Sequence, residues 1–97
     1  MSKSIAKDKY VLQLYVSGMS TKSMEAIENI KKLRNTINDD FELEIIDIYK
    51  NPEVAAEQHI VFSPSLIKQF PLPRRILIGT LSDTQKVVSA LGFTLKS

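Results

Sequence analysis

The sequence contains no cysteine, no tryptophan and only three glycines, which stand alone at positions 18, 79 and 92. Without cysteine the chain has no disulfide, no thiolate metal cluster and no redox dithiol. Isolated glycines exclude a glycine-rich phosphate loop, and no apolar run approaches the roughly 18 residues of a membrane span. These absences exclude disulfide-stabilised scaffolds, dithiol oxidoreductases and P-loop nucleotide-binding proteins.

The composition is that of one globular domain. Of the 97 residues 43% are hydrophobic and 25% are charged, and the formal net charge is +2, which is too small to indicate a nucleic-acid ligand. Residues 1–9 are polar and basic where a signal peptide needs an apolar centre. We therefore expect a cytoplasmic protein with no membrane partner, a flexible arm over residues 1–9 and a single domain over residues 10–97.

The first half of the chain predicts a strand, a helix and a strand. Residues 10–17 (YVLQLYVS) form a β-branched and aromatic run typical of a buried strand. Ser20 or Thr21 can cap a helix, and alternating side chains predict a second strand over residues 41–48. The helix between them has an apolar stripe of Met24, Ile27, Ile30, Leu33 and Ile37. This βαβ unit predicts two parallel strands with a right-handed crossover.

The second half supports two interpretations. Asn51-Pro52 predicts a short helix to about His59. In the first interpretation Pro64 begins a strand to Phe70, residues 75–78 form its hairpin partner, and Ser82 with Gln85 makes a capping box before a helix that buries Val87, Val88 and Leu91. The order βαβαββα is that of an α/β, thioredoxin-like fold with a mixed four-stranded sheet.

The second interpretation assigns the same residues differently. Ser63-Pro64 becomes the start of a helix that contains Leu66, Ile67 and Phe70, residues 59–62 become a strand, and residues 86–88 become extended. The Ser63-Pro64 bond distinguishes the two, because the thioredoxin fold habitually has a cis proline there and the helix demands trans. Pro64 is therefore the expected conformational pivot.

No candidate catalytic or metal-binding residue forms part of a recognisable enzyme site. His59 is the only histidine and is expected to be structural or at the surface, since one histidine without cysteine cannot complete a transition-metal site. Asp47 is expected to cap the end of a strand. Ser20 and Ser23 lie where thioredoxin-fold enzymes have cysteine, and a hydroxyl cannot replace a thiolate in disulfide exchange. We expect no enzymatic activity and no cofactor.

A basic cluster in the second half predicts a binding surface. Arg74 and Arg75, with Lys68 nearby, have no aromatic platform or further basic residues that would favour nucleic acid. An acidic protein surface is the better candidate partner for these three residues.

Four segments closely resemble the KaiB family of circadian-clock proteins. They are residues 14–18 (LYVSG), 46–52 (IDIYKNP), 63–66 (SPSL) and 71–83 (PLPRRILIGTLSD). The resemblance implies a non-enzymatic protein that binds the ATPase ring of a KaiC-type protein through Lys68, Arg74 and Arg75. It also implies a metamorphic chain, with a tetrameric ground state of order βαββααβ and a monomeric thioredoxin-like state that engages the partner.

The sequence departs from the family pattern at several positions. Glu25 and Glu44 occupy positions that are commonly Arg and Lys, His59 replaces a common Lys, and Ile76 stands where an Arg is usual. These changes favour a diverged KaiC as the partner or, alternatively, weak binding. The alternative is a cysteine-free, thioredoxin-like adaptor in stress or two-component signalling that does not bind KaiC, similar to the KaiB-like sensor domain of certain histidine kinases.

Residues near the end of the chain favour the thioredoxin-like state. Ala90 stabilises a helix relative to the glycine common in cyanobacterial members by roughly 1 kcal/mol, and Gly92 suits the position after a helix end. In the strand-rich state an exposed sheet edge would have to be buried against sister chains, which predicts a homo-oligomer, dimer or tetramer.

Overall fold

The order of helices and strands is βαβαββα, as the first interpretation predicts. The computed structural model describes residues 9–60 and 63–96, so the expected arm lies outside the described residues except for Lys9. The elements are β1 (Tyr10–Val16), α1 (Thr21–Leu33), β2 (Phe41–Asp47), α2 (Pro52–Glu57), β3 (Ser65–Phe70), β4 (Arg75–Ile78) and α3 (Thr84–Leu91). Within the described ranges, no helix is long and apolar enough to cross a membrane.

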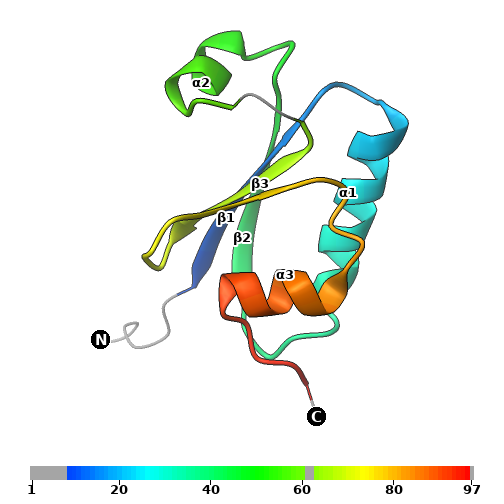
Figure 1. Ribbon diagram of the computed structural model, residues 1–97, viewed down its shortest axis with the longest axis vertical. Coiled ribbons are helices and arrows are strands. Elements are labelled where there is room, and N and C mark those ends of the chain that lie inside the picture. The colour runs from blue at the N-terminus through cyan, green and yellow to red at the C-terminus, as the bar shows by residue number, and fades with distance from the viewer. Residues whose placement is uncertain (1–8, 61–62, 97) are drawn as a thin grey trace.

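The four strands form one mixed sheet in the order β2-β1-β3-β4. β1 and β2 are parallel, as the βαβ unit requires, and α1 connects them (Figure 1). β3 runs antiparallel to β1 and to β4, so β3 and β4 make a hairpin at the side of the sheet. The predicted mixed sheet is confirmed.

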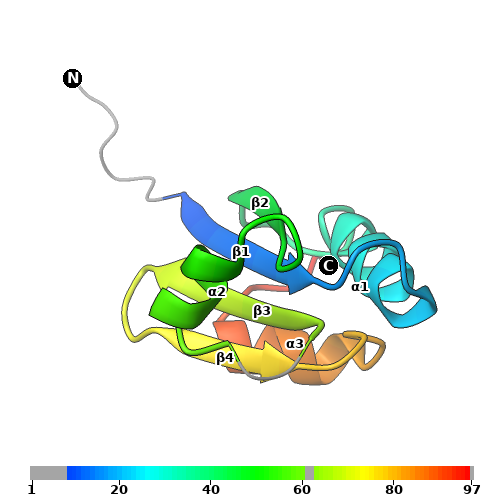
Figure 2. The same cartoon turned by 90° about the horizontal axis from the view of Figure 1, so that it is seen from above.

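Helices of unequal size cover the two faces of the sheet (Figure 2). α1 and α3 pack on one face, where alternate residues of β1 meet both helices in the larger core cluster; this cluster includes Leu12, Leu14, Val16, Ala26, Ile30, Val87, Val88 and Leu91. The short α2 lies on the other face, where Tyr15, Ile46 and Ile67 pack against Val54 and Ile60. The second face is therefore thinly covered.

Local sequence signals explain most helix ends. Ser20 caps α1, its Oγ accepting the backbone N–H of Ser23 at 3.3 Å. Pro52 is at the start of α2, but the Asn51 side chain does not cap it and instead donates to the Asp47 carbonyl at 3.1 Å. Gly92 ends α3 with φ of 78°, a left-handed conformation that glycine adopts without strain.

Three expectations need correction. The cap of α3 is Asp83 and not Ser82, since the Asp83 carboxylate accepts the N–H of Lys86 at 3.1 Å. α2 ends at Glu57, before His59. The predicted stripe of α1 is confirmed at Ile30, Leu33 and Ile37, which are buried, and needs correction at Met24, which is 38% exposed. Ser23 and Ala26, which were not predicted, are buried on the same helix. Small side chains let α1 approach the sheet closely, which apolar periodicity alone does not show.

The second interpretation is not the conformation observed. Residues 86–88 lie within α3, and residues 66–70 lie within β3. His59 and Ile60 lie outside any strand, while residues 61 and 62 of the predicted strand lie outside the described residues. The Ser63-Pro64 peptide bond is cis, as the first interpretation expects.

Candidate functional site

The turn between β1 and α1 holds two hydroxyls where a redox enzyme of this fold has thiols. Ser20 Oγ donates to Ser23 Oγ at 2.8 Å, and Ser23 Oγ accepts the backbone N–H of Ser17 at 3.1 Å. The Ser23 side chain is fully buried. Both hydroxyls therefore hold the turn and the helix start together, and this site has no group for thiol chemistry.

The carboxylate of Asp47 has a structural role at the end of β2. Its Oδ1 accepts the backbone N–H groups of Gly18 at 3.3 Å and Tyr49 at 2.9 Å. The side chain thus ties the β1–α1 turn to the loop before α2. The expectation of a carboxylate that caps the strand end is confirmed.

His59 is exposed in the turn after α2, with φ of 57°. Among the described residues, no group of three or more side chains of the metal-ligating types comes together. The expected surface position of His59 is confirmed.

Lys68 does not lie on the surface with Arg74 and Arg75, as the predicted basic cluster requires. Its side chain in β3 is only 5% exposed, on the face that α3 covers. The ammonium donates to the Leu91 carbonyl oxygen at 3.4 Å and lies 5.6 Å from the centre of the Tyr10 ring. Lys68 is therefore a buried anchor for the end of α3 in this conformation, and it is not an accessible contact beside Arg74 and Arg75.

Arg74 and Arg75 are exposed where the hairpin turn enters β4. The Arg74 guanidinium donates to Gln58 Oε1 at 2.9 Å. In the part of the chain that the structure describes, the salt bridges join Asp40 to Lys9 and Arg34, so neither hairpin arginine is paired with a carboxylate. Two accessible positive charges remain at this corner of the molecule.

Exposed apolar side chains accompany these arginines. Phe70 ends β3 and is exposed, and Leu72 in the turn is 77% exposed. Aromatic residues and arginine are the types enriched at the centres of protein interfaces. We call Phe70, Leu72, Arg74 and Arg75 the hairpin end. Sequence reasoning missed Phe70 and Leu72, because apolar residues beside prolines resemble core residues.

A chain of glutamine side chains crosses the sheet beneath the hairpin end. Gln69 Nε2 donates to Gln13 Oε1 at 2.8 Å and to Gln58 Oε1 at 3.3 Å. Gln13 Nε2 in turn donates to Glu44 at 3.1 Å. Arg74 and Glu44, which carry opposite charges, are thus linked through three amides.

Tyr15 in β1 also takes part in this hydrogen-bond network. Its hydroxyl donates to Gln13 Oε1 at 3.1 Å. Burial raises the pKa of Tyr15, the negative charge of Glu44 raises it further, and Arg74 opposes the shift. The network therefore favours a neutral phenol that serves as a donor.

The four positions at which the sequence lacks a basic residue that is common in the resembling family lie on different helices, strands and turns. Glu25 is exposed on α1, Glu44 on β2 and Ile76 on β4, whereas His59 follows α2. Of these four, only Ile76 lies on the hairpin that carries Arg74 and Arg75.

Comparisons with known proteins agree on one family. The protein-family model of the KaiB domain matches residues 13–93 of this chain. A circadian clock protein KaiB3 from Synechocystis is 40% identical over 85 residues, covering 87% of this chain and 83% of that protein. The circadian clock oscillator protein KaiB from Synechococcus elongatus is 42% identical over 86 residues, covering 84% and 81%.

Solved structures resemble the fold. The N-terminal domain of Synechococcus elongatus SasA superposes with a TM-score of 0.74 at 23% identity, covering 95% of this chain and 91% of that one. The Drosophila melanogaster thioredoxin Deadhead gives a TM-score of 0.70 at 17% identity, covering 90% and 82%. At these identities the likeness concerns the fold alone, and it agrees with the thioredoxin-like order.

Proposed function

Because the chain belongs to the KaiB family of circadian-clock proteins, we propose that it is a non-enzymatic regulatory protein that binds the ATPase ring of a KaiC-type protein. Binding would modulate the phosphorylation or ATPase cycle of that ring. The proposal includes the cytoplasmic location expected from the sequence and the role of Pro64 as the pivot between two folds.

The observation that carries this proposal is the hairpin end. Two guanidinium groups without carboxylate partners in the described chain stand beside the exposed side chains of Phe70 and Leu72. An acidic surface with an apolar centre complements this arrangement, since charges steer the encounter and buried apolar groups slow dissociation. We therefore assign the contact to Arg74 and Arg75 and place Lys68 outside it.

The test is binding of the full chain to the KaiC-type ATPase from the same genome, with and without ATP, measured by biolayer interferometry. The double variant Arg74→Glu/Arg75→Glu should lower the association rate at least tenfold, because rim charges act mainly on encounter. The matched control is Lys22→Glu/Lys31→Glu, which makes the same charge change at two exposed positions of α1. This control should bind within about twofold of the wild type.

Each result has a defined meaning. No retention of the wild type under either nucleotide condition removes the proposal. Equal losses in both double variants would mean that net charge, and not the hairpin end, determines binding.

The alternative function, an adaptor in stress or two-component signalling, makes a different prediction. The exposed carboxylates of Glu25 and Glu44 would then face a basic partner. Capture of a histidine kinase by the wild type, with no contact to the KaiC-type ring, would establish this alternative.

A further inference from the structure

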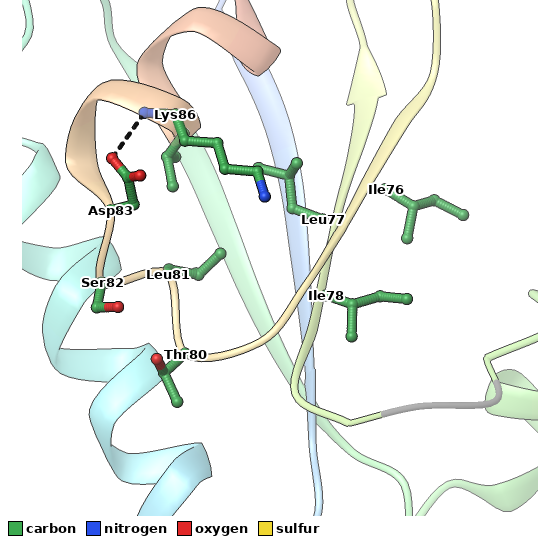
Figure 3. A pocket seen from close by; sticks show the side chains of 9 residues that line it. Ile76, Leu77, Ile78, Thr80, Leu81, Ser82, Asp83 and Lys86 are labelled. Atoms are coloured by element: carbon green, nitrogen blue, oxygen red, sulfur yellow. Dashed lines mark hydrogen bonds between the residues drawn. The ribbon is translucent and has the colours of Figure 1, made fainter.

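The two arginines of the hairpin end differ in how their side chains are held. The Arg74 guanidinium donates from Nη2 to Gln58 Oε1 at 2.9 Å. The Arg75 side chain has no hydrogen bond or ion pair to the described residues. The groove alongside the rest of β4 contains a carboxylate, Asp83, but that group accepts the backbone N–H of Lys86 (Figure 3). Of the two arginines, Arg74 is therefore the one whose guanidinium is held in place by the described chain.

The acceptor of this hydrogen bond, Gln58, is itself held. Gln58 directly follows α2 and is half-buried. Gln69 Nε2 in β3 donates to the same oxygen of Gln58 at 3.3 Å. The chain on both sides is anchored as well, because Val54 and Ile60 pack against the core cluster on this face of the sheet. Gln58 therefore offers Arg74 an acceptor in a fixed position.

The orientation of the three amides follows from the charged groups at the two ends of the network, since a guanidinium only donates and a carboxylate only accepts. Arg74 therefore faces the oxygen of Gln58. At the other end, Glu44 faces the nitrogen of Gln13. Between them, Gln69 Nε2 donates to the oxygens of Gln58 and Gln13. Both charged ends thus require the same orientation of every amide, and no donor faces another donor.

We propose that Gln58 is a positioning residue that holds the Arg74 guanidinium ready to bind a carboxylate of the partner in a bidentate pair. This inference rests on the proposed function. Gln58 uses only one of the several N–H donors of the guanidinium, and the others can form the two parallel hydrogen bonds of such a pair. Because the side chain is already ordered, binding costs less conformational entropy. Arg75 contributes charge that steers the encounter.

The first test examines the guanidinium groups by NMR in the free chain, without the partner. The two Nη groups of an arginine exchange places by rotation about the Nε–Cζ bond. This exchange should be at least about threefold slower for Arg74 than for Arg75, because the hydrogen bond must break first. Gln58→Ala should raise the Arg74 rate to that of Arg75. The matched control Gln85→Ala, at an exposed glutamine of α3, should leave it unchanged.

The second test separates the association and dissociation rates of the full chain and the KaiC-type ring by biolayer interferometry. Gln58→Ala should dissociate about two- to tenfold faster than the wild type, because Arg74 must then be ordered on binding. Its association rate should equal that of the wild type, since every charge remains. Gln85→Ala should match the wild type in both rates. Loss of a charge slows association instead, so the two rates distinguish positioning from steering.

Matched substitutions at the two arginines test the bidentate pair. Arg74→Lys keeps the charge but loses the planar fork of donors, so it should dissociate about two- to tenfold faster. Arg75→Lys makes the same change one residue later and should bind within about twofold of the wild type. Gln58→Ala should add nothing to Arg74→Lys, because both act through one contact. Combined with Arg75→Lys, it should keep its full effect.

Two results would overturn the proposal. One is an exchange rate at Arg74 that Gln58→Ala leaves unchanged. The other is a dissociation rate that Gln58→Ala leaves at the wild-type value or raises equally in the presence of Arg74→Lys. A wild type that the ring does not retain removes the proposed function instead. The NMR measurement on the free chain then still decides whether Gln58 holds Arg74.

Discussion

The ammonium nitrogen of Lys68 lies 3.4 Å from the carbonyl oxygen of Leu91, the last residue of α3. The carbonyl groups at the end of a helix have no partner within the helix and carry partial negative charge, so a cation there is favourable. The Tyr10 ring lies 5.6 Å from the same ammonium, and the Tyr10 hydroxyl donates to the Gly92 carbonyl at 3.0 Å. Lys68 and Tyr10 together hold the end of α3 on the sheet.

Lys68→Ala should therefore destabilise this fold by about 1–3 kcal/mol, because a buried carbonyl loses a charged donor. Urea denaturation measures the change. Lys22→Ala on the exposed face of α1 should stay within about 0.5 kcal/mol of the wild type. A variant at Lys68 with unchanged stability and weakened partner binding would mean that Lys68 is a surface contact after all.

The corrected cap of α3 can be tested by comparing two neighbouring residues. Asp83→Ala should lower the free energy of unfolding by about 1 kcal/mol, because the N–H of Lys86 loses its acceptor. Ser82→Ala should change the stability much less, since the Ser82 side chain is exposed and is not the cap. The opposite ranking in urea denaturation would restore the capping box predicted from the sequence.

The raised pKa of Tyr15 predicts a loss of stability at alkaline pH. Burial and the charge of Glu44 lift this pKa above its ordinary value of 10.0, and the pKa of Tyr10 is raised as well, by burial and then by Asp39. The stabilisation from a neutral phenol is complete below pH 10, and it is lost as the pH rises above 10 through the pKa of the folded state.

Denaturation with urea between about pH 9 and pH 11 should show this loss. Tyr15→Phe should give a shallower decline, since it removes one of the two phenols. Tyr49→Phe, at an exposed tyrosine, serves as the control and should follow the wild type. An equally steep decline in Tyr15→Phe would contradict the role assigned to the buried hydroxyl.

The sequence predicted local structure better than it predicted the positions of polar side chains. Residues 10–17, 41–48 and 75–78 carry strong strand signals, and each contains a strand in the structure. The choice between helix and strand for residues 86–88 depends on tertiary packing, because Val87 and Val88 suit either structure until they join the core cluster that α1 and α3 form on one face of the sheet.

The candidate site was predicted only in part for a related reason. Arg74 and Arg75 are exposed as expected, but the burial of Lys68 arises because α3, far along the chain, ends above β3. Neither the spacing of basic residues nor their number contains that information. Similarly, both Ser82 and Asp83 are good capping residues, and only the path of the chain out of β4 selects Asp83.

The central claim, that the hairpin end contacts a KaiC-type ring, is tested most directly by hydroxyl-radical footprinting of the complex. Phe70 and Leu72 should become protected from oxidation. Met19 and Tyr49 are equally suitable exposed targets, and they follow the carboxyl ends of β1 and β2. Phe70 pairs with Val11 near the other end of β1. At about 3.3 Å per residue, the two ends of that seven-residue strand are roughly 20 Å apart.

We predict protection of Phe70 and Leu72 at saturating ring, with Met19 and Tyr49 oxidised as rapidly as in the free chain. Protection of Met19 and Tyr49 with Phe70 and Leu72 unchanged would contradict the assignment and place the contact at the opposite end of the sheet.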